Sequence, residues 1–212
     1  MAFIAARIAL AAGSLALLCL AALHGLSPEF DPSWRMVSEY ANGRYPWVLT
    51  LVFVGWAVSS WAVAVALWPS AGSWVVKLGL GFVALSGIGA ACGAMFDVNH
   101  PSHGLAFALG VPTHPIGALL VGVPLARHER FARLRWVSQL PWVALVLMVG
   151  SFVLLGSSAA RVGVELDPTK PWHEVPAGVT ALMGWANRLL VTAYIAWSLV
   201  AAGLSLREKG AA

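Results

Sequence analysis

Long apolar runs alternate with short polar segments along this chain, and the alternation predicts its elements. Each run is long enough to cross a hydrocarbon core of about 30 Å as a helix, which needs about 20 residues. The runs lie near residues 3–25, 47–68, 75–96, 104–126, 136–157 and 179–205. We therefore expect an all-α membrane protein, a single domain built as a bundle of six transmembrane helices.

The composition favours a membrane protein over a soluble one. Of the 212 residues, 59% are hydrophobic and 10% are charged, whereas soluble domains carry about 25% charged residues. The lipid bilayer is thus an expected partner. The first apolar run follows Arg7 and resembles a signal peptide, but it is too long for one, and no small-residue cleavage pattern follows it. We expect this first helix to be retained.

Lysine and arginine gather on one side of the predicted bundle, with the two termini. The residues on this side are Arg7, Lys77, Arg127, Arg130, Arg133, Arg135, Arg207 and Lys209. Cytoplasmic segments carry the excess of these residues in membrane proteins. We therefore expect both termini in the cytoplasm and a multi-pass protein of the inner (plasma) membrane. The net charge of +4 then reflects orientation, and no nucleic-acid partner is expected.

The two loops on the outer side, 26–46 and 158–178, are about twenty residues each, a length that often accompanies function. Within the first, the spacing of apolar residues over 34–40 predicts a short amphipathic helix that ends at Gly43. We expect this helix to roof the bundle.

Small residues and prolines mark the middle of the bundle. Gly89 and Gly93 fit the small-xxx-small pattern that lets membrane helices approach closely. Pro112 and Pro115 bracket His114 and remove two backbone donors in mid-helix. We expect a kink there that can open a cavity.

Ionisable side chains within the predicted spans are the first functional candidates, because such groups are costly in a membrane. His24, His114 and Arg188, with Asn187 beside it, meet this criterion. His114 is either a neutral imidazole bonded to a neighbouring helix, or a general base, proton relay or axial haem ligand.

Two readings of Arg188 stay open. A buried guanidinium needs a partner, and an ion pair with Glu39 or Asp97 would fasten the first outer loop to the bundle. The same group can also grip a lipid phosphate or a substrate carboxylate.

The stretch FDVNHPSHG, residues 96–104, separates the third and fourth predicted helices. Its first interpretation is a turn followed by a capped helix. A second is a contact with substrate or protons. A third is a divalent metal bound by Asp97, His100 and His103. We expect no metal and no other cofactor, and keep the metal as the alternative.

Short motifs across the whole chain resemble a family of bacterial six-helix integral membrane proteins, called domain of unknown function 998. They are Asp31-Pro32 after the first helix, Ser38-Glu39-Tyr40 before the second, Phe96-Asp97 ending the third, and His103 or His114 in or before the fourth. The resemblance implies the fold and an outer site, and no established activity.

These observations combine into one functional hypothesis with an alternative. The hypothesis is an outward-facing polar pocket, roofed by 26–46 and walled by the third, fourth and sixth helices, that binds or processes a lipid or other amphiphile. Its candidate catalytic residues are Asp97, His114 and Glu39, and its candidate ligand-binding residues are Arg188, Asn187, His24 and His103. The alternative is a non-enzymatic accessory or scaffold subunit with a membrane protein partner. Whether the protein is an enzyme stays open.

Overall fold

The structure, a computed structural model, describes residues 1–166, 172 and 174–206. This part of the chain contains helices and no strand. The elements, with η for a 3₁₀ helix, are α1 (Ala2–Leu26), η1 (Val37–Asn42), α2 (Pro46–Leu67), η2 (Trp68–Ser70), α3 (Trp74–Met95), α4 (His103–Gly110), α5 (Thr113–Leu125), η3 (Glu129–Phe131), α6 (Leu134–Val137), α7 (Leu140–Arg161) and α8 (Met183–Leu206).

Six helical stretches of the described chain are long and apolar enough to cross a membrane, which confirms the predicted fold class. They are α1, α2 with η2, α3, α4 with α5, η3 through α7, and α8. Within the fifth stretch the long helix starts at Leu140 rather than near 136, because Pro141 occupies its first turn, where proline is favoured.

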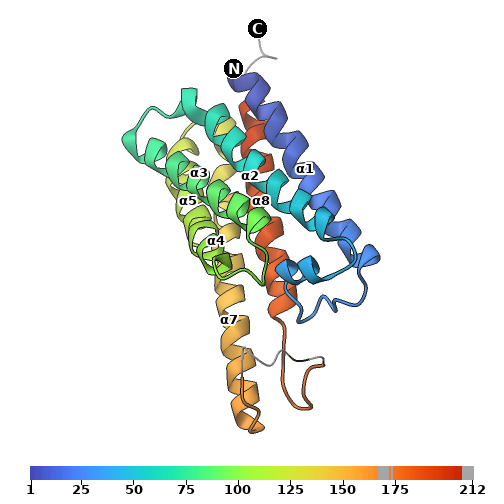
Figure 1. Ribbon diagram of the computed structural model, residues 1–212. Helices are drawn as coiled ribbons and strands as arrows, with labels where there is room; N and C mark the ends of the chain where they lie inside the picture. Colours follow the sequence, from blue (N-terminus) through green and yellow to red (C-terminus); the bar gives the residue numbers. More distant parts are fainter. Residues whose placement is uncertain (167–171, 173, 207–212) are drawn as a thin grey trace.

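α8 runs through the centre of the bundle and packs against α1, α2 and α7 (Figure 1). α3 packs against α2, α4 and α5. The start of α1 and the last turn of α8 lie at one end, which we call the terminal end. The segment 27–45 and the turn 96–102 lie at the other, which we call the loop end. Which end faces the cytoplasm stays a prediction.

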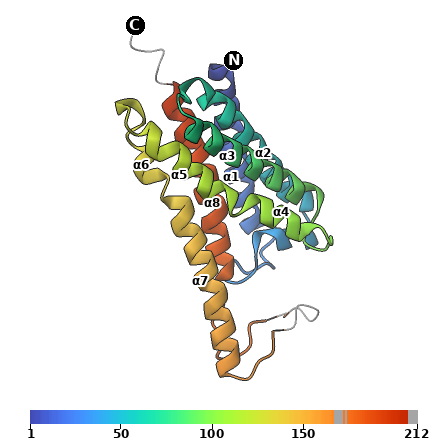
Figure 2. The same cartoon turned by 90° about the vertical axis from the view of Figure 1, so that its left-hand side faces the viewer.

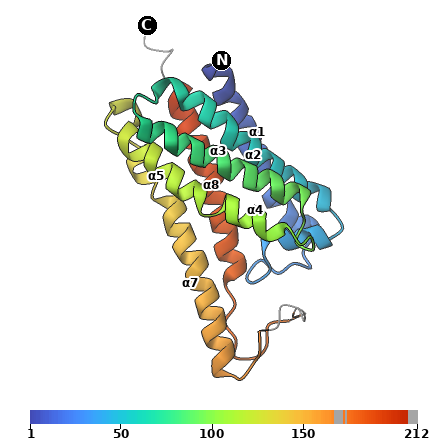
Figure 3. The same cartoon turned by 60° about the vertical axis from the view of Figure 1, so that its left-hand side comes forward.

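α7 leans away from α4 and extends past the rest of the bundle at the loop end (Figures 2 and 3). It ends in a Schellman motif, in which Gly163 has φ +70° and the Val164 N–H donates to the Ala159 carbonyl at 3.0 Å. The Ser158 hydroxyl of α7 accepts a hydrogen bond from the Thr180 N–H at 2.9 Å. Because Thr180 is held on α7 in this way, α8 begins later than the sequence range near 179.

Residues 27–45, which we call the lid segment, cross the bundle at the loop end. η1 lies within them and is followed by Gly43, which confirms the predicted short helix. Its apolar side chains Val37 and Tyr40 are buried.

The fourth span is broken, as the sequence predicts. α4 ends at Gly110 and α5 begins at Thr113. Pro115 has no N–H for the carbonyl of Val111, four residues earlier, so this carbonyl loses its helical donor.

Side-chain hydroxyls donate to three successive carbonyls at this break. The pairs are Tyr194 with Val111 at 2.7 Å, Ser86 with Gly110 at 2.9 Å, and Thr113 with Leu109. No water reaches the middle of a bilayer, so a broken helix there needs such internal donors. The hydroxyls on α3 and α8 thus stabilise the break and join the fourth span to its neighbours.

α3 and α4 approach most closely where two glycines face each other. A Cβ on Gly89 would lie 2.2 Å from the Gly110 nitrogen. The expected close packing of small residues is confirmed at this crossing.

Candidate functional site

Arg188 is the centre of a polar cluster at the loop end. It lies in α8 and is 5% exposed. Its guanidinium donates to five acceptors, which are His24 Nε2 at 2.9 Å, the Tyr40 hydroxyl at 2.8 Å, and the carbonyls of Pro32, Arg35 and Gly184. Three of these five acceptors belong to the lid segment, so the arginine fastens that segment to α8.

The expectation that Arg188 forms an ion pair with Glu39 or Asp97 is wrong. Among the described residues, neither acid pairs with it. Glu39 instead pairs with Arg35 at 2.8 Å and accepts from the Met36 N–H at 2.7 Å. Backbone carbonyls take the place of an acid because the lid segment wraps directly over the first turn of α8.

A glycine makes this close wrapping possible. A Cβ on Gly184 would lie 2.5 Å from the Pro32 carbonyl oxygen and 2.7 Å from that of Arg35. The Gly184 N–H also donates to the Ser33 carbonyl at 3.1 Å. Any side chain at this position would push the lid segment off α8.

The hydrogen bonds of His24 define its tautomer. Its Nδ1 lies 2.9 Å from the Leu20 carbonyl, which can only accept, so Nδ1 carries the proton. Its Nε2 accepts from the Arg188 Nε–H, which can only donate. His24 is therefore a neutral imidazole that bridges α1 and α8.

Asn187 makes a second link between α8 and the lid segment. Its side-chain oxygen accepts from the Val37 N–H at 2.8 Å in a buried position. This bond fixes the orientation of the amide, and Asn187 also lines a cavity described below.

Asp31 forms a turn at the start of the lid segment. Its carboxylate accepts from the Ser33 hydroxyl at 2.7 Å and from the Ser33 N–H at 2.8 Å. These two bonds, more than the nearby charge of Arg188, lower the pKa of the Asp31 carboxyl.

The stretch FDVNHPSHG contains the turn between α3 and α4, as the first interpretation predicts, but α4 begins without the expected side-chain cap at its N-cap residue Ser102. The Asp97 carboxylate accepts from the Asn99 N–H at 2.8 Å, and the Asn99 amide donates to Asn42 in the lid segment at 2.7 Å. His100 stacks on Phe96, with ring centroids 4.7 Å apart.

The candidate metal ligands do not converge. No group of three or more His, Cys, Asp or Glu side chains among the described residues is placed to hold a metal ion, Asp97, His100 and His103 included. This arrangement lends the metal alternative no support, and the expected absence of a cofactor stays a prediction.

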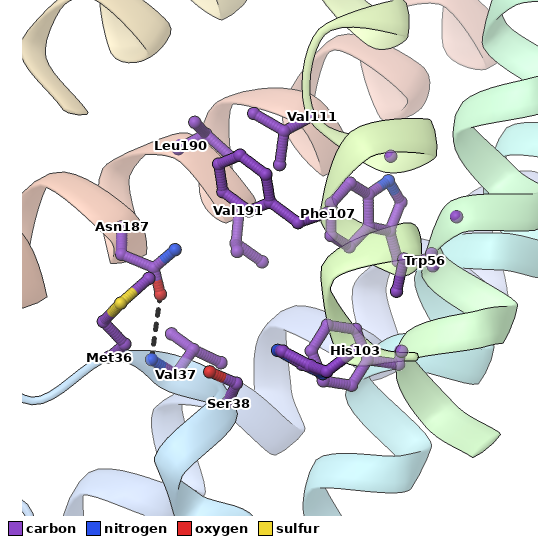
Figure 4. A pocket seen from close by; sticks show the side chains of 16 residues that line it. Met36, Val37, Ser38, Trp56, His103, Phe107, Val111, Asn187, Leu190 and Val191 are labelled. Carbon is purple, nitrogen blue, oxygen red and sulfur yellow. Dashed lines mark hydrogen bonds between the residues drawn. The ribbon is translucent and has the colours of Figure 1, made fainter. Parts of the chain in front are cut away.

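A cavity of about 70 Å³ lies beneath the lid segment, between α2, α3, α4 and α8 (Figure 4). Its walls are mostly apolar, with Phe53, Trp56, Phe107, Leu190 and Val191 among them. Its polar residues are Ser38, His103 and Asn187. The cavity thus occupies the place predicted for the pocket, but its lining is mainly apolar.

Few of the candidate site residues reach this cavity. His103 and Asn187 line it, whereas Arg188, His24, Glu39 and His114 do not. Asp97 borders a separate pocket of about 140 Å³ between the lid segment, α2 and the end of α3.

His103 presents its ring to the cavity from the first turn of α4 (Figure 4). Its Nδ1 lies 2.9 Å from the Phe96 carbonyl, so Nδ1 carries a proton. In the neutral ring, Nε2 is then an acceptor for a partner in or near the cavity.

His114 is fully buried in α5, away from the cavity. Neither ring nitrogen has a hydrogen-bond partner within the described residues. The ring stacks on the Tyr194 ring at 4.5 Å and meets the Trp197 ring edge-on at 5.5 Å. The expected bond to a neighbouring helix is not formed in this part of the chain.

Sequence reasoning did not name three contributors to this region as site residues, although Ser38 and Tyr40 belong to the family motif Ser38-Glu39-Tyr40. Tyr40 and Gly184 complete the Arg188 cluster, and Ser38 lines the cavity. A signal existed for Tyr40, because a tyrosine hydroxyl in an apolar setting needs a partner. No local signal marks Gly184, whose role depends on contacts with Pro32 and Arg35, far away in the sequence.

Comparisons with known proteins complete the description. No curated protein and no solved structure gives a significant match. A family comparison matches residues 10–204, almost the whole chain, to the family described as Protein of unknown function (DUF998). The match includes the lid segment, the broken fourth span and Arg188, and the chain belongs to this family.

Proposed function

We propose that this membrane protein binds an amphiphile in the cavity beneath the lid segment. The observation that supports the proposal is the character of the wall, which is apolar apart from three polar residues. Mostly apolar walls with a few placed polar groups are typical of small-molecule sites.

The polar residues favour an uncharged head group. His103 Nε2 can accept a hydrogen bond, the Asn187 NH₂ can donate one, and the Ser38 hydroxyl can do both. None of the three carries a formal charge when the imidazole is neutral. A hydroxyl or ester group meets these donors and acceptors without bringing an unpaired charge into the bundle.

The size of the cavity limits how much ligand it holds. About 70 Å³ is room for a few water molecules, well below the roughly 300–1,000 Å³ of a complete ligand site. The cavity is partly open, and Phe107 in its wall is 45% exposed on α4. We therefore propose that the rest of the amphiphile lies in the bilayer beside α4, and that a larger ligand displaces the lid segment.

The other candidate residues take supporting roles in this proposal. Arg188 donates to the Arg35 carbonyl of the lid segment and to His24 Nε2 on α1, so it holds the roof of the cavity and His24 orients it. Asp97 and Glu39 stabilise the turns on either side of it. No catalytic step is assigned to any of these residues.

Photo-crosslinking with a diazirine-bearing fatty alcohol tests this proposal. Protein in lipid nanodiscs is irradiated with the probe, and labelled peptides are mapped by mass spectrometry. Labels are expected on α4 and α8. Ala106→Phe, which fills the cavity, is expected to abolish them, whereas Ala108→Phe changes an exposed alanine of the same helix and is expected to keep them.

A second variant tests the head-group contact. His103→Ala is expected to weaken labelling up to about tenfold, the value of one hydrogen bond. Labelling spread evenly over all lipid-facing helices, or unchanged in Ala106→Phe, would contradict the proposal. Copurification of another membrane protein in stoichiometric amount, together with no preferential labelling by the lipid probe, would favour the accessory-subunit alternative.

A further inference from the structure

A second apolar groove lies at the terminal end of the bundle, on the face where α2 and α3 lie side by side. Its volume is about 630 Å³, far larger than that of the cavity under the lid segment. The start of the chain also borders the groove, and the full lining is Met1, Ala2, Ala64, Val65, Trp68, Pro69, Lys77, Leu80, Gly81 and Ala84. Apart from Lys77, these lining residues have apolar side chains.

The groove runs along the helix axes. On α3, positions 77, 81 and 84 lie on one helix face. Positions 61 and 65 of α2 and position 68 of η2, which continues it, do the same. Seven residues span about 10 Å at 1.5 Å per residue. The Trp61 indole crosses from α2 to donate to the Ala84 carbonyl at 3.0 Å, which joins the two helices at the deep end of the groove.

Gly81 makes the groove deep. A Cβ at this position would meet no atom within 4 Å, so the residue is not needed for helix packing. Its missing side chain leaves open space on a lipid-facing surface.

The groove has a cationic mouth. The Lys77 ammonium lies in the first turn of α3, 5.9 Å from the centre of the Trp68 ring. Trp68 is 56% exposed and Trp74, next to it at this end, is 73% exposed. Exposed indoles at helix ends are typical of the head-group level of a bilayer, so Lys77 is placed where phosphates lie.

The charges around the mouth favour an anionic occupant. The terminal end also carries Arg7 and the arginines of residues 127–135. Among the described residues of this end, Glu129 is the only acid. Basic groups next to a membrane surface attract anionic lipids, at about 1 kcal/mol per residue.

We propose that this groove is a binding site for one anionic phospholipid. An acyl chain lies along Val65 and Gly81, and the Lys77 ammonium pairs with the head-group phosphate. The site is at the opposite end of the bundle from the lid segment, so this proposal does not depend on ligand binding in the cavity.

Native mass spectrometry of the whole protein tests the site. The protein is released from nanodiscs that contain equal amounts of phosphatidylglycerol and phosphatidylcholine, and bound lipids are counted. The natural chain is expected to retain one phosphatidylglycerol. Lys77→Gln is expected to reduce this preference about fivefold, the effect of one lysine at an anionic surface. Gly81→Leu, which fills the groove, is expected to remove retention of either lipid.

Two controls match these changes. Arg161→Gln removes an exposed charge at the loop end, away from the groove, and Gly150→Leu adds the same side chain at an exposed glycine of α7 whose Cβ also meets nothing within 4 Å. Both are expected to behave like the natural chain. Retention that is unchanged in Lys77→Gln and Gly81→Leu, or lost equally in the controls, would overturn the proposal.

Discussion

Arg188 and His114 are two buried ionisable residues of the same bundle, and their surroundings differ in hydrogen-bond partners. The guanidinium of Arg188, at the loop end, meets five acceptors from α1, α8 and the lid segment. The imidazole of His114, in the middle of the bundle, meets aromatic rings and has no hydrogen-bond partner in the described chain.

The difference follows from charge. A guanidinium cannot lose its proton in a protein, so its burial requires acceptors, and the lid segment supplies them. An imidazole can stay neutral, and a stacked ring tolerates two unpaired nitrogens at a lower cost. A buried ionisable residue in a membrane span is therefore not sufficient evidence of catalysis. Arg188 fastens the lid segment to α8, and His114 packs among aromatic rings in the core.

The largest effect is expected for Arg188→Met, which removes every donor of the cluster but keeps the length of the side chain. Five acceptors then lose a charged donor, at a cost of about 3–5 kcal/mol. Thermal unfolding in detergent measures the loss. Arg188→Lys should recover part of it, since an ammonium has three donors, and Arg161→Met at the exposed end of α7 should change little. Equal unfolding temperatures for Arg188→Met and Arg161→Met would contradict this role.

Gly184→Ala tests the same contact through sterics alone. Its Cβ would collide with the carbonyls of Pro32 and Arg35, and overpacking of this kind costs about 1–3 kcal/mol. Limited proteolysis should cut the lid segment faster in this variant. Gly203→Ala in the same helix has open space around its Cβ and should leave cleavage unchanged. Similar cleavage in both variants would show that the lid segment does not depend on this contact.

Tyr194→Phe tests the helix break beside His114. It removes the donor of the Val111 carbonyl, and a buried acceptor left without a partner costs about 1–3 kcal/mol. Tyr45→Phe, at a partly exposed tyrosine, is the matched control. Chemical unfolding that does not distinguish the two variants would mean that the break needs no hydroxyl from α8.

His114→Phe is expected to have a smaller effect, within about 1 kcal/mol. The new ring keeps the stack on Tyr194. It removes only two nitrogens that have no hydrogen-bond partner, so no bond is lost and the free energy of unfolding changes little. Thermal unfolding measures this as well. A loss as large as that of Arg188→Met would reveal a polar partner for the imidazole and would restore a proton-handling role.

The smallest effect concerns pH and Asp31. Because the bonds from Ser33 lower the pKa of this carboxyl in the folded protein, its contribution to stability is present above the unfolded value of about 3.9. It is lost as the pH falls below that value through the lower folded pKa. Asp31→Asn should therefore narrow the small difference between the unfolding temperatures at pH 7 and pH 3, and Glu174→Asn, at an exposed acid, should not.

The architecture was predictable because it rests on local properties. Run length predicts six spans, Pro112 and Pro115 predict the break, and the spacing of apolar residues over 34–40 predicts η1. The position of the lid segment followed from the same reasoning.

The polar contacts were not predictable to the same degree. Charge pairing suggested Glu39 or Asp97 for Arg188, but each acid bonds within its own turn. Backbone carbonyls carry no sequence signature, so a cluster built from Pro32 and Arg35 carbonyls is invisible until the lid segment is placed. Its partner Gly184 is likewise defined by a contact across the chain.

Hydrogen–deuterium exchange of the lid segment in nanodiscs tests most directly the central claim that Arg188 and Asn187 hold a roof over the cavity. Peptides that cover residues 31–43 should exchange slowly in the natural chain, since the Val37 N–H is bonded to Asn187. Arg188→Lys and Asn187→Leu should each raise their exchange, while peptides of α2 stay unchanged. Fast exchange of the lid segment in the natural chain, or equal protection in all three proteins, would contradict the account.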